Sequence, residues 1–195
     1  MNILYSIWGI RKFLLITQNL LFNAVYGRRF KVKVKVFGFP VISIEKFSEI
    51  KIGKNLILIS SSYFSDPGIN HPVIIRTLRS EAILEIGDNV GISGGGICVA
   101  EKVIIGNNLL MGANSFITDT DFHPIEKKNR RFQKGNIISK KVVIEDNVFI
   151  GMNSLILKGV TIGENSIIGA GSIVTNDIPP NCIAIGIPAK VIKKI

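Results

Sequence analysis

Residues 144–174 read IEDNVF IGMNSL ILKGVT IGENSI IGAGSI V, which is five successive units of six residues and the start of a sixth. Each unit opens on an aliphatic residue, and a small or β-branched residue stands four places later in every unit. The opening residues are Ile144, Ile150, Ile156, Ile162, Ile168 and Val174; those four places later are Val148, Ser154, Val160, Ser166 and Ser172. A period of six is neither helical nor that of a simple strand, so it indicates a repeated supersecondary unit.

The same unit occurs nearer the N-terminus. It is found at Ile105, Met111 and Ile117, at Ile86 and Ile92 after allowing one extra residue near Cys98, and at Ile52-Gly53-Lys54-Asn55-Leu56. A short strand followed by a tight corner fits six residues, because Gly or Asn relieves the backbone where the chain turns. Three such units close one triangular coil whose aliphatic residues stack inward on the next coil. The sequence therefore predicts an all-β parallel β-helix.

Composition places limits on the class of protein. The 195 residues can bury one core, and hydrophobic residues make up 47% with a mean hydropathy of +0.38. These residues are dispersed between Gly, Asn and Asp rather than gathered into spans of about 20, which excludes a helical membrane protein. The net charge of +10 favours an anionic partner. No nucleic-acid-binding module or aromatic platform is recognisable, so a phosphorylated cofactor, an anionic glycan or an acidic lipid surface remains.

The two cysteines, Cys98 and Cys182, have neither metal-ligand spacing nor a disulfide framework. We therefore expect a reduced cytoplasmic setting and no metal. The histidines, His71 and His123, are too few for the three-histidine zinc site of the carbonic anhydrases that share this kind of solenoid.

The N-terminal segment differs from the repeats. Apolar residues at helical spacing, followed by Gly27-Arg28-Arg29, predict one or two amphipathic helices over residues 1–29. Arg11, Lys12 and several amides make the segment too polar to span a membrane. Two interpretations remain: the helix caps the solenoid, or residues 1–26 make peripheral contact with the inner face of a membrane. The β-helix domain is then expected over residues 30–195, beginning with the alternating strand Lys31–Val36, whose Val side chains point inward.

One polar excursion interrupts the repeat. After Ile117 the next aliphatic residue in register is Ile144, so the intervening chain is expected to protrude as a loop at about residues 118–142. His123 lies at its base, with Asp119 and Asp121 just upstream. An imidazole whose tautomer a carboxylate fixes is suited to act as a general base near neutral pH. His71, which precedes Pro72, is read instead as the start of a turn.

Several stretches resemble the hexapeptide-repeat acyltransferases, in particular bacterial sugar O-acetyltransferases of polysaccharide and lipopolysaccharide synthesis and the related galactoside and maltose acetyltransferases. The stretches are Ile86–Gly94, Thr118–Pro124, Gly169–Ser172 and Gly186–Lys190. The resemblance covers about residues 83–195. It implies a left-handed coil, a homotrimer, and acetyl-CoA bound as acyl donor between neighbouring solenoids.

The resemblance also implies roles for single residues. His123 matches the family's general base, and the backbone amide near Gly151 matches the group aimed at the developing oxyanion. Ala170 and Thr175 match positions along the pantetheine arm of the donor. One departure is Phe149, where relatives often carry Trp.

Two lysines of the C-terminal tail complete the expected donor site, since Lys190 and Lys193 match basic positions beside the nucleotide phosphates. The expected function is acetyl-CoA-dependent O-acetylation of a sugar hydroxyl in surface polysaccharide or lipopolysaccharide synthesis. The expected acceptor is a glycan, either free or lipid-linked, that residues 126–133 contact. Transfer to a small amine or to serine, and a non-catalytic β-helix scaffold, remain as alternatives.

Overall fold

The computed structural model describes residues 2–128, 130–132 and 135–195, and it describes side chains of the N-terminal helix from residue 13 onward. The elements are α1 (Asn2–Phe30), β1 (Lys35–Phe37), β2 (Val41–Ser43), β3 (Glu49–Ile52), β4 (Ile57–Ile59), the 3-10 turn η1 (Ser62–Phe64), β5 (Ile74–Thr77), β6 (Ile83–Ile86), β7 (Gly91–Ser93), β8 (Gly96–Val99), β9 (Lys102–Ile105), β10 (Leu110–Met111), β11 (Phe116–Thr118), β12 (Val142–Ile144), β13 (Phe149–Ile150), β14 (Leu155–Ile156), β15 (Thr161–Ile162), β16 (Ile167–Ile168), β17 (Ile173–Val174), β18 (Cys182–Gly186) and β19 (Ala189–Lys194).

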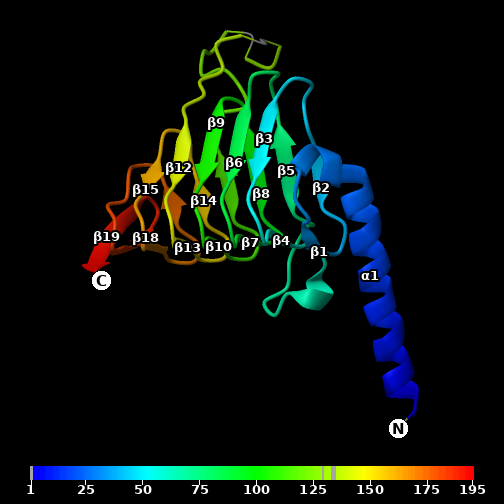
Figure 1. Ribbon diagram of the computed structural model, residues 1–195. Coiled ribbons are helices and arrows are strands. Elements are labelled where there is room, and N and C mark those ends of the chain that lie inside the picture. Colours follow the sequence, from blue (N-terminus) through cyan, green and yellow to red (C-terminus); the bar gives the residue numbers. More distant parts are fainter. Residues whose placement is uncertain (1, 129, 133–134) are drawn as a thin grey trace.

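The strands form three sheets that wind around one axis (Figure 1). Sheet A has the order β1-β4-β7-β10-β13-β16-β18-β19, sheet B the order β17-β14-β11-β8-β5-β2, and sheet C the order β15-β12-β9-β6-β3. Successive strands of the chain pass from sheet A to B to C, and strands of successive coils pair in parallel. This is the parallel β-helix that the six-residue period predicts.

The core is the stack of residues that the repeat places inward. All six opening aliphatic residues of residues 144–174 are fully buried, and so are the residues four places after them. The strand pairings join Ile150 to Ile168 and Ile156 to Val174, so equivalent residues of neighbouring coils lie on one another. Because each aliphatic side chain is removed from water, burial of the stack supplies the main stabilisation of the coil.

The corners depend on asparagines with a positive φ. Asn147 (φ 56°) and Asn165 (φ 61°) adopt the left-handed conformation, which Asn tolerates better than most residues. Their side-chain amides also form a ladder along the corner, because Nδ2 of Asn147 donates to Asn165 (2.9 Å) and Nδ2 of Asn165 donates to Asn181 (2.9 Å). The asparagines therefore both turn the chain and join successive coils.

The helix α1 covers the open end of the solenoid beside β1 (Figure 1). Phe22 and Phe30 are buried against the core. The alternation of residues 31–36 places Val34 and Val36 inward and the lysines outward, as predicted. The strand itself spans only Lys35–Phe37, the residues that pair with Ile57–Ile59 of β4.

The C-terminal tail is a strand rather than a free extension. β19 pairs with β18 in antiparallel orientation and closes the far end of sheet A. The chain reverses at residues 186–189, where the Ile187–Pro188 peptide bond is cis. Both ends of the β-helix are thus covered, one by α1 and the other by this hairpin.

Candidate functional site

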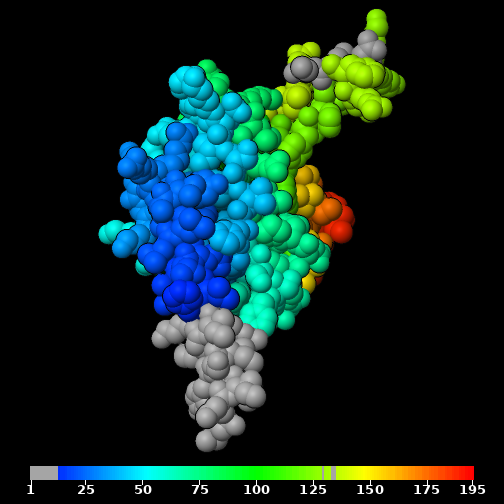
Figure 2. Space-filling view, turned by 90° about the vertical axis from the view of Figure 1, so that its right-hand side faces the viewer, coloured from blue at the N-terminus to red at the C-terminus, as the bar shows by residue number. Residues whose placement is uncertain are grey.

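The long loop of residues 119–141 leaves the solenoid between β11 of sheet B and β12 of sheet C, and protrudes from the body (Figures 1 and 2). Its neck is closed by three interactions between its two arms. Thr120 and Ser139 form an antiparallel bridge, the N–H of Asp121 donates to the carbonyl of Ile138 (3.1 Å), and the N–H of Lys140 donates to the carbonyl of Asp119 (2.8 Å). The loop therefore begins from a fixed base.

His123 follows this neck directly. The preceding residue, Phe122, has a φ of 62°, a conformation that an aromatic residue seldom adopts and that turns the chain sharply. The next residue, Pro124, is buried, whereas the imidazole of His123 is exposed. A strained turn on one side and a buried proline on the other hold an accessible imidazole at the base of the loop.

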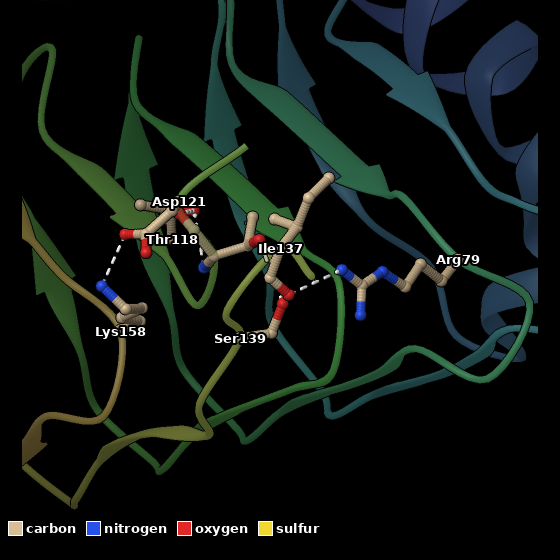
Figure 3. A network of polar contacts seen from close by, with 7 residues as sticks. Arg79, Thr118, Asp121, Ile137, Ser139 and Lys158 are labelled. Atoms are coloured by element: carbon tan, nitrogen blue, oxygen red, sulfur yellow. Dashed lines mark hydrogen bonds and ion pairs between the residues drawn. The ribbon is translucent and has the colours of Figure 1, made fainter. Parts of the chain in front are cut away.

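Asp121 is paired with a lysine from the following coil. Nζ of Lys158 lies 2.5 Å from Oδ1 of Asp121, and both side chains are about three-quarters buried, with 25% and 26% exposed. Figure 3 shows the two side chains pointing toward one another. The second oxygen, Oδ2 of Asp121, is buried and has no hydrogen-bond partner among the described residues. Asp121 thus has one oxygen available for another group, two residues before His123.

Asp119 has a different role. It is fully buried, and its two oxygens accept hydrogen bonds from the backbone N–H groups of Ala100 and Glu101, each at 2.7 Å. These amides belong to the neighbouring coil, so Asp119 fastens the corner at which the loop leaves to the coil before it. With both oxygens engaged in this way, we assign Asp119 to the structure of the corner and leave Asp121 as the carboxylate available to His123.

A second cation contacts the returning arm of the loop. Nη2 of Arg79 donates to the carbonyl of Ile137 at 3.3 Å (Figure 3). At the neck, the hydroxyl of Ser139 donates to that of Thr120 (3.0 Å), and the N–H of Thr120 approaches the hydroxyl of Thr118 (3.3 Å). The base of the loop is therefore a polar network anchored to two further coils.

Gly151 and Ala170 lie together at the corner between sheets A and B. A Cβ on Gly151 would come 2.5 Å from the backbone nitrogen of Ala170, so the two successive coils touch there. The N–H of Gly151 donates to the carbonyl of Ile168 (2.7 Å), which means that this amide is not free to stabilise an oxyanion. No acceptor is found for the N–H of the next residue, Met152, in the described part of the chain, and this amide fits the predicted role better.

Thr175 lies at the opposite corner, directly after β17. The pairing of β14 with β17 places it one coil beyond Leu157 and hence close to Lys158. Between the two corners, Leu155 and Ile173 are paired neighbours on the outward face of sheet B, and both are partly exposed. The sequence-predicted residues thus flank one short apolar strip, with Ala170 at one edge and the loop neck at the other.

Lys190 and Lys193 are exposed on β19. Lys190 pairs with Ile185 and Lys193 with Ile183, and these isoleucines flank the buried Ala184. Because paired residues of an antiparallel sheet point to the same side, both ammonium groups lie on the outward face of sheet A. Phe149 is 43% exposed on that same sheet, where it pairs with Leu110 and Ile167.

Other candidate groups are not available for chemistry at this site. Nδ1 of His71 lies 2.8 Å from the carbonyl of Pro72, as expected for a residue in a turn. Cys98 is buried beneath the loop neck, and burial raises the pKa of its thiol, which disfavours the nucleophilic thiolate. The described residues contain no cluster of three or more His, Cys, Asp or Glu that could hold a metal.

One residue of the site, Lys158, cannot be identified from the sequence alone. It stands within a regular repeat, and its partner, Asp121, lies 37 residues earlier. The predicted acceptor-contacting stretch, residues 126–133, includes residues 129 and 133, which lie outside the described residues; its other members are exposed. The available signal was that Lys158 stands at a repeat position where an apolar or turn residue would be expected.

Comparison with known proteins agrees with the repeat architecture. The family model for bacterial transferase hexapeptide (six repeats) matches residues 141–176. The galactoside O-acetyltransferase of Escherichia coli is 47% identical over 93 residues, 48% of this chain and 44% of that protein. A putative acetyltransferase of Schizosaccharomyces pombe is 50% identical over 93 residues, with the same two shares covered. The matched segment thus spans less than half the length of these curated relatives.

A solved structure extends the likeness over most of the chain. The structure of a galactoside acetyltransferase in complex with coenzyme A is 30% identical, covers 89% of this chain and 69% of that one, and superimposes with a TM-score of 0.54. A hexapeptide-repeat acetyltransferase from Vibrio cholerae, complexed with acetyl coenzyme A, is 25% identical with a TM-score of 0.50, and covers 88% of this chain and 74% of that one. The predicted fold class, a left-handed parallel β-helix with an N-terminal helical segment, is confirmed, and the chain belongs to the hexapeptide-repeat acetyltransferase family.

Proposed function

We propose that this chain transfers an acetyl group from acetyl-CoA to a hydroxyl of a sugar. The observation that carries the proposal is the placement of an exposed His123 at a rigid loop neck, beside a strip of sheet B bordered by Ala170 and Thr175. Family membership supports the reaction, and the relatives named for galactosides and coenzyme A support a sugar acceptor and this donor. Among the described residues of the neck, His123 is the exposed imidazole, the kind of group that can accept a proton near neutral pH.

In the proposed reaction, His123 removes the proton of the acceptor hydroxyl while that oxygen attacks the thioester carbonyl. The new carbon–oxygen bond forms, the carbon–sulfur bond breaks, and the proton passes from the imidazole to the departing thiolate. Both substrates must be bound at once, since no covalent enzyme intermediate is required. The residues of this chain therefore contribute by positioning the two substrates and moving one proton.

Asp121 is proposed to orient the imidazole. Its Oδ1 is occupied by Lys158, whereas Oδ2 has no partner among the described residues and can accept a hydrogen bond from a ring nitrogen of His123. The ion pair with Lys158 holds the carboxylate close to the neck. An oriented, anionic Asp121 would favour the imidazolium that forms during transfer.

The acyl donor is proposed to lie along the C-terminal coils. Its pantetheine arm would follow the strip formed by Leu155 and Ile173, between Ala170 and Thr175, and the N–H of Met152 would donate to the oxyanion. Lys190 and Lys193 would contact the phosphates, because exposed ammonium groups on one face are suited to a phosphorylated nucleotide.

We further propose a homotrimer that completes this site. Leu110 is 60% exposed, and it forms an outward apolar row on sheet A with Phe149 and Ile167. A neighbouring solenoid would remove this row from water and would supply the second wall of the donor site. A cytoplasmic location and a role in surface polysaccharide or lipopolysaccharide synthesis complete the proposal.

The test is an acetyl-transfer assay with acetyl-CoA and a panel of acceptors. Free thiol release would be followed with galactosides, nucleotide-activated sugars and lipid-linked sugars, and with serine and small amines in parallel. The proposal predicts O-acetylated sugar as product. Turnover only with an amine or serine would show that the acceptor is that compound and not a sugar. Failure to bind coenzyme A would favour a non-catalytic scaffold.

A further inference from the structure

A surface helix usually turns its apolar face toward the core, but α1 turns polar side chains toward the protein. Its amides face the β-helix: Asn19 exchanges hydrogen bonds with the backbone N–H and carbonyl of Val36 (2.8 Å each), and Asn23 does the same with Val34 (2.9 Å each). These side chains complete the hydrogen bonds of an otherwise open sheet edge, as a further strand would. The polar residues of the helix are thus used inward, toward the protein.

The outward face of α1 is therefore apolar. Six large hydrophobic residues of its described part are 50–67% exposed: Phe13, Leu14, Ile16, Leu20, Leu21 and Val25. Between residues 13 and 25, the only exposed polar side chain is that of Thr17. Its hydroxyl is already bonded to the helix carbonyls of Phe13 (3.1 Å) and Leu14 (2.9 Å), so it needs no water. In Figure 2 the described part of α1 forms a ridge that faces the viewer, with no described segment lying over it.

Positive charge is concentrated at the same end of the molecule. Residues 1–44 hold seven of the 24 lysines and arginines and none of the 14 acidic residues. Arg28, Lys31 and Lys33 are exposed just beyond the apolar part of the ridge. Lys33 and Lys35 also line an apolar groove of about 820 Å³ between α1 and sheet A, with Leu15, Leu20 and Ile57 among its walls. An apolar ridge bordered by cations, with no anion nearby in the sequence, complements a surface that is itself apolar inside and anionic outside.

We infer that the outward face of α1 lies in the surface of a bilayer that contains anionic phospholipids. The ridge formed by Leu20, Leu21 and Val25 would enter the acyl region, and Arg28, Lys31 and Lys33 would contact the lipid phosphates. Among the described residues no helix is long and apolar enough to cross a membrane, so the helix would lie along the surface. Lipid binding does not require the proposed catalysis; only the further consequence, access to a lipid-linked acceptor, rests on it.

The experiment is co-sedimentation of the full chain with vesicles of phosphatidylcholine alone or with one-third phosphatidylglycerol. We expect binding to the anionic vesicles that is at least tenfold stronger than to the neutral ones, and that weakens as salt rises from 0.05 to 0.5 M. Equal binding to neutral and anionic vesicles, or no binding to either, would overturn the inference.

Two double variants separate the apolar and charged contributions. Leu21→Gln with Val25→Gln removes apolar side chains while keeping charge and helix propensity, and it should weaken vesicle binding at least tenfold. Arg28→Glu with Lys33→Glu reverses two charges and should also weaken vesicle binding at least tenfold. The matched controls are Ile125→Gln with Ile138→Gln, and Lys127→Glu with Lys128→Glu, all on the distant loop. The controls should retain binding to within about twofold, and an equal loss in them would show non-specific attraction and refute the assignment to α1.

A second copy of the chain is the competing occupant of the ridge. Sedimentation equilibrium without lipid distinguishes it, because the Leu21→Gln, Val25→Gln variant should keep the oligomeric state of the unaltered chain. A smaller assembly in that variant would show that the ridge is an interface between subunits and would overturn the lipid assignment. Circular dichroism of each variant confirms that it remains folded. Acetyl transfer to a soluble acceptor, where found, should be unchanged in the two variants of the α1 region, Leu21→Gln with Val25→Gln and Arg28→Glu with Lys33→Glu, which keeps a failure of this inference distinct from a failure of the proposed function.

Discussion

Nζ of Lys158 and Oδ1 of Asp121 lie 2.5 Å apart although the residues belong to different coils. This pair joins the outgoing arm of the long loop to the turn between β14 and β15 (Figure 3). The pair also fixes the position of the Asp121 carboxylate, which stands two residues before His123 in the sequence. We therefore propose that Lys158 positions the base of the loop rather than touching substrate.

Replacing Lys158 by Met should loosen the loop. The partly buried carboxylate of Asp121 would lose its cation, which costs more than loss of an exposed pair. We expect tryptic cleavage between residues 127 and 131 to accelerate several-fold and kcat to fall about tenfold. Lys102→Met removes a pair of lysine and glutamate on sheet C (3.5 Å), and as the matched control it should change neither rate. Equal cleavage of both variants would contradict a positioning role.

Asp119→Ala should mainly lower the free energy of unfolding. The kcat of the molecules that remain folded should change less. Two buried backbone N–H groups, those of Ala100 and Glu101, would lose a charged acceptor, at a cost of about 3 kcal/mol in the free energy of unfolding. Urea denaturation followed by circular dichroism measures the change. Asp66→Ala, at an exposed position, is the control and should have little effect. A stable Asp119→Ala variant with greatly reduced turnover would instead place Asp119 in the catalytic machinery.

Asparagine contributes to a corner in two ways, through the amide ladder and through its tolerance of a positive φ. Variants at Asn165 separate the two contributions. Asn165→Ala removes the amide ladder and also places a residue with a Cβ at φ 61°, so we expect a loss of about 2 kcal/mol in the free energy of unfolding. Asn165→Gly removes the ladder but tolerates the backbone, and should cost less. If the glycine variant were the less stable of the two, the left-handed conformation would not be the reason for asparagine at this corner.

Charge reversal on β19 tests the donor site. Lys190→Glu with Lys193→Glu should weaken coenzyme A binding at least tenfold, because phosphates would meet carboxylates in place of ammonium groups. Isothermal titration calorimetry provides the affinity, and the difference from the unaltered chain should shrink at high salt. Lys127→Glu with Lys128→Glu makes the same change of charge on the loop and should leave the affinity close to normal. Unchanged affinity in the β19 variant would remove these lysines from the donor site.

Much of the fold could be predicted because the core of this protein has a fixed sequence period. Every opening residue from Ile144 to Val174 is buried as the register requires, since each coil repeats the packing of the one before it. The loop was equally visible, because a polar stretch without Ile or Val in register cannot stack within a coil. The residues at its base, including His123, could therefore be located from sequence spacing alone.

Other features depend on contacts that no local pattern encodes. The pairing of Lys158 with Asp121 and the bonding of the Gly151 amide to Ile168 follow from which coil lies beside which. Helical spacing indicated an amphipathic N-terminal segment, but not that Asn19 and Asn23 would face inward to complete a strand edge. The resemblance assigns the lysines of the C-terminal tail to the donor phosphates, but their place on a paired strand arises from the hairpin of β18 and β19.

The most direct test of the central claim is the turnover of His123→Ala with acetyl-CoA and the acceptor found in the transfer assay, compared with the unaltered chain and with His71→Ala. The account predicts that kcat of His123→Ala falls by about two to four orders of magnitude, while coenzyme A affinity and oligomeric state are retained. His71→Ala should remain nearly as active as the unaltered chain, because its Nδ1 lies 2.8 Å from the adjacent Pro72 carbonyl in a turn outside the loop neck. A folded His123→Ala protein with near-normal turnover would contradict the assignment of His123 as the general base.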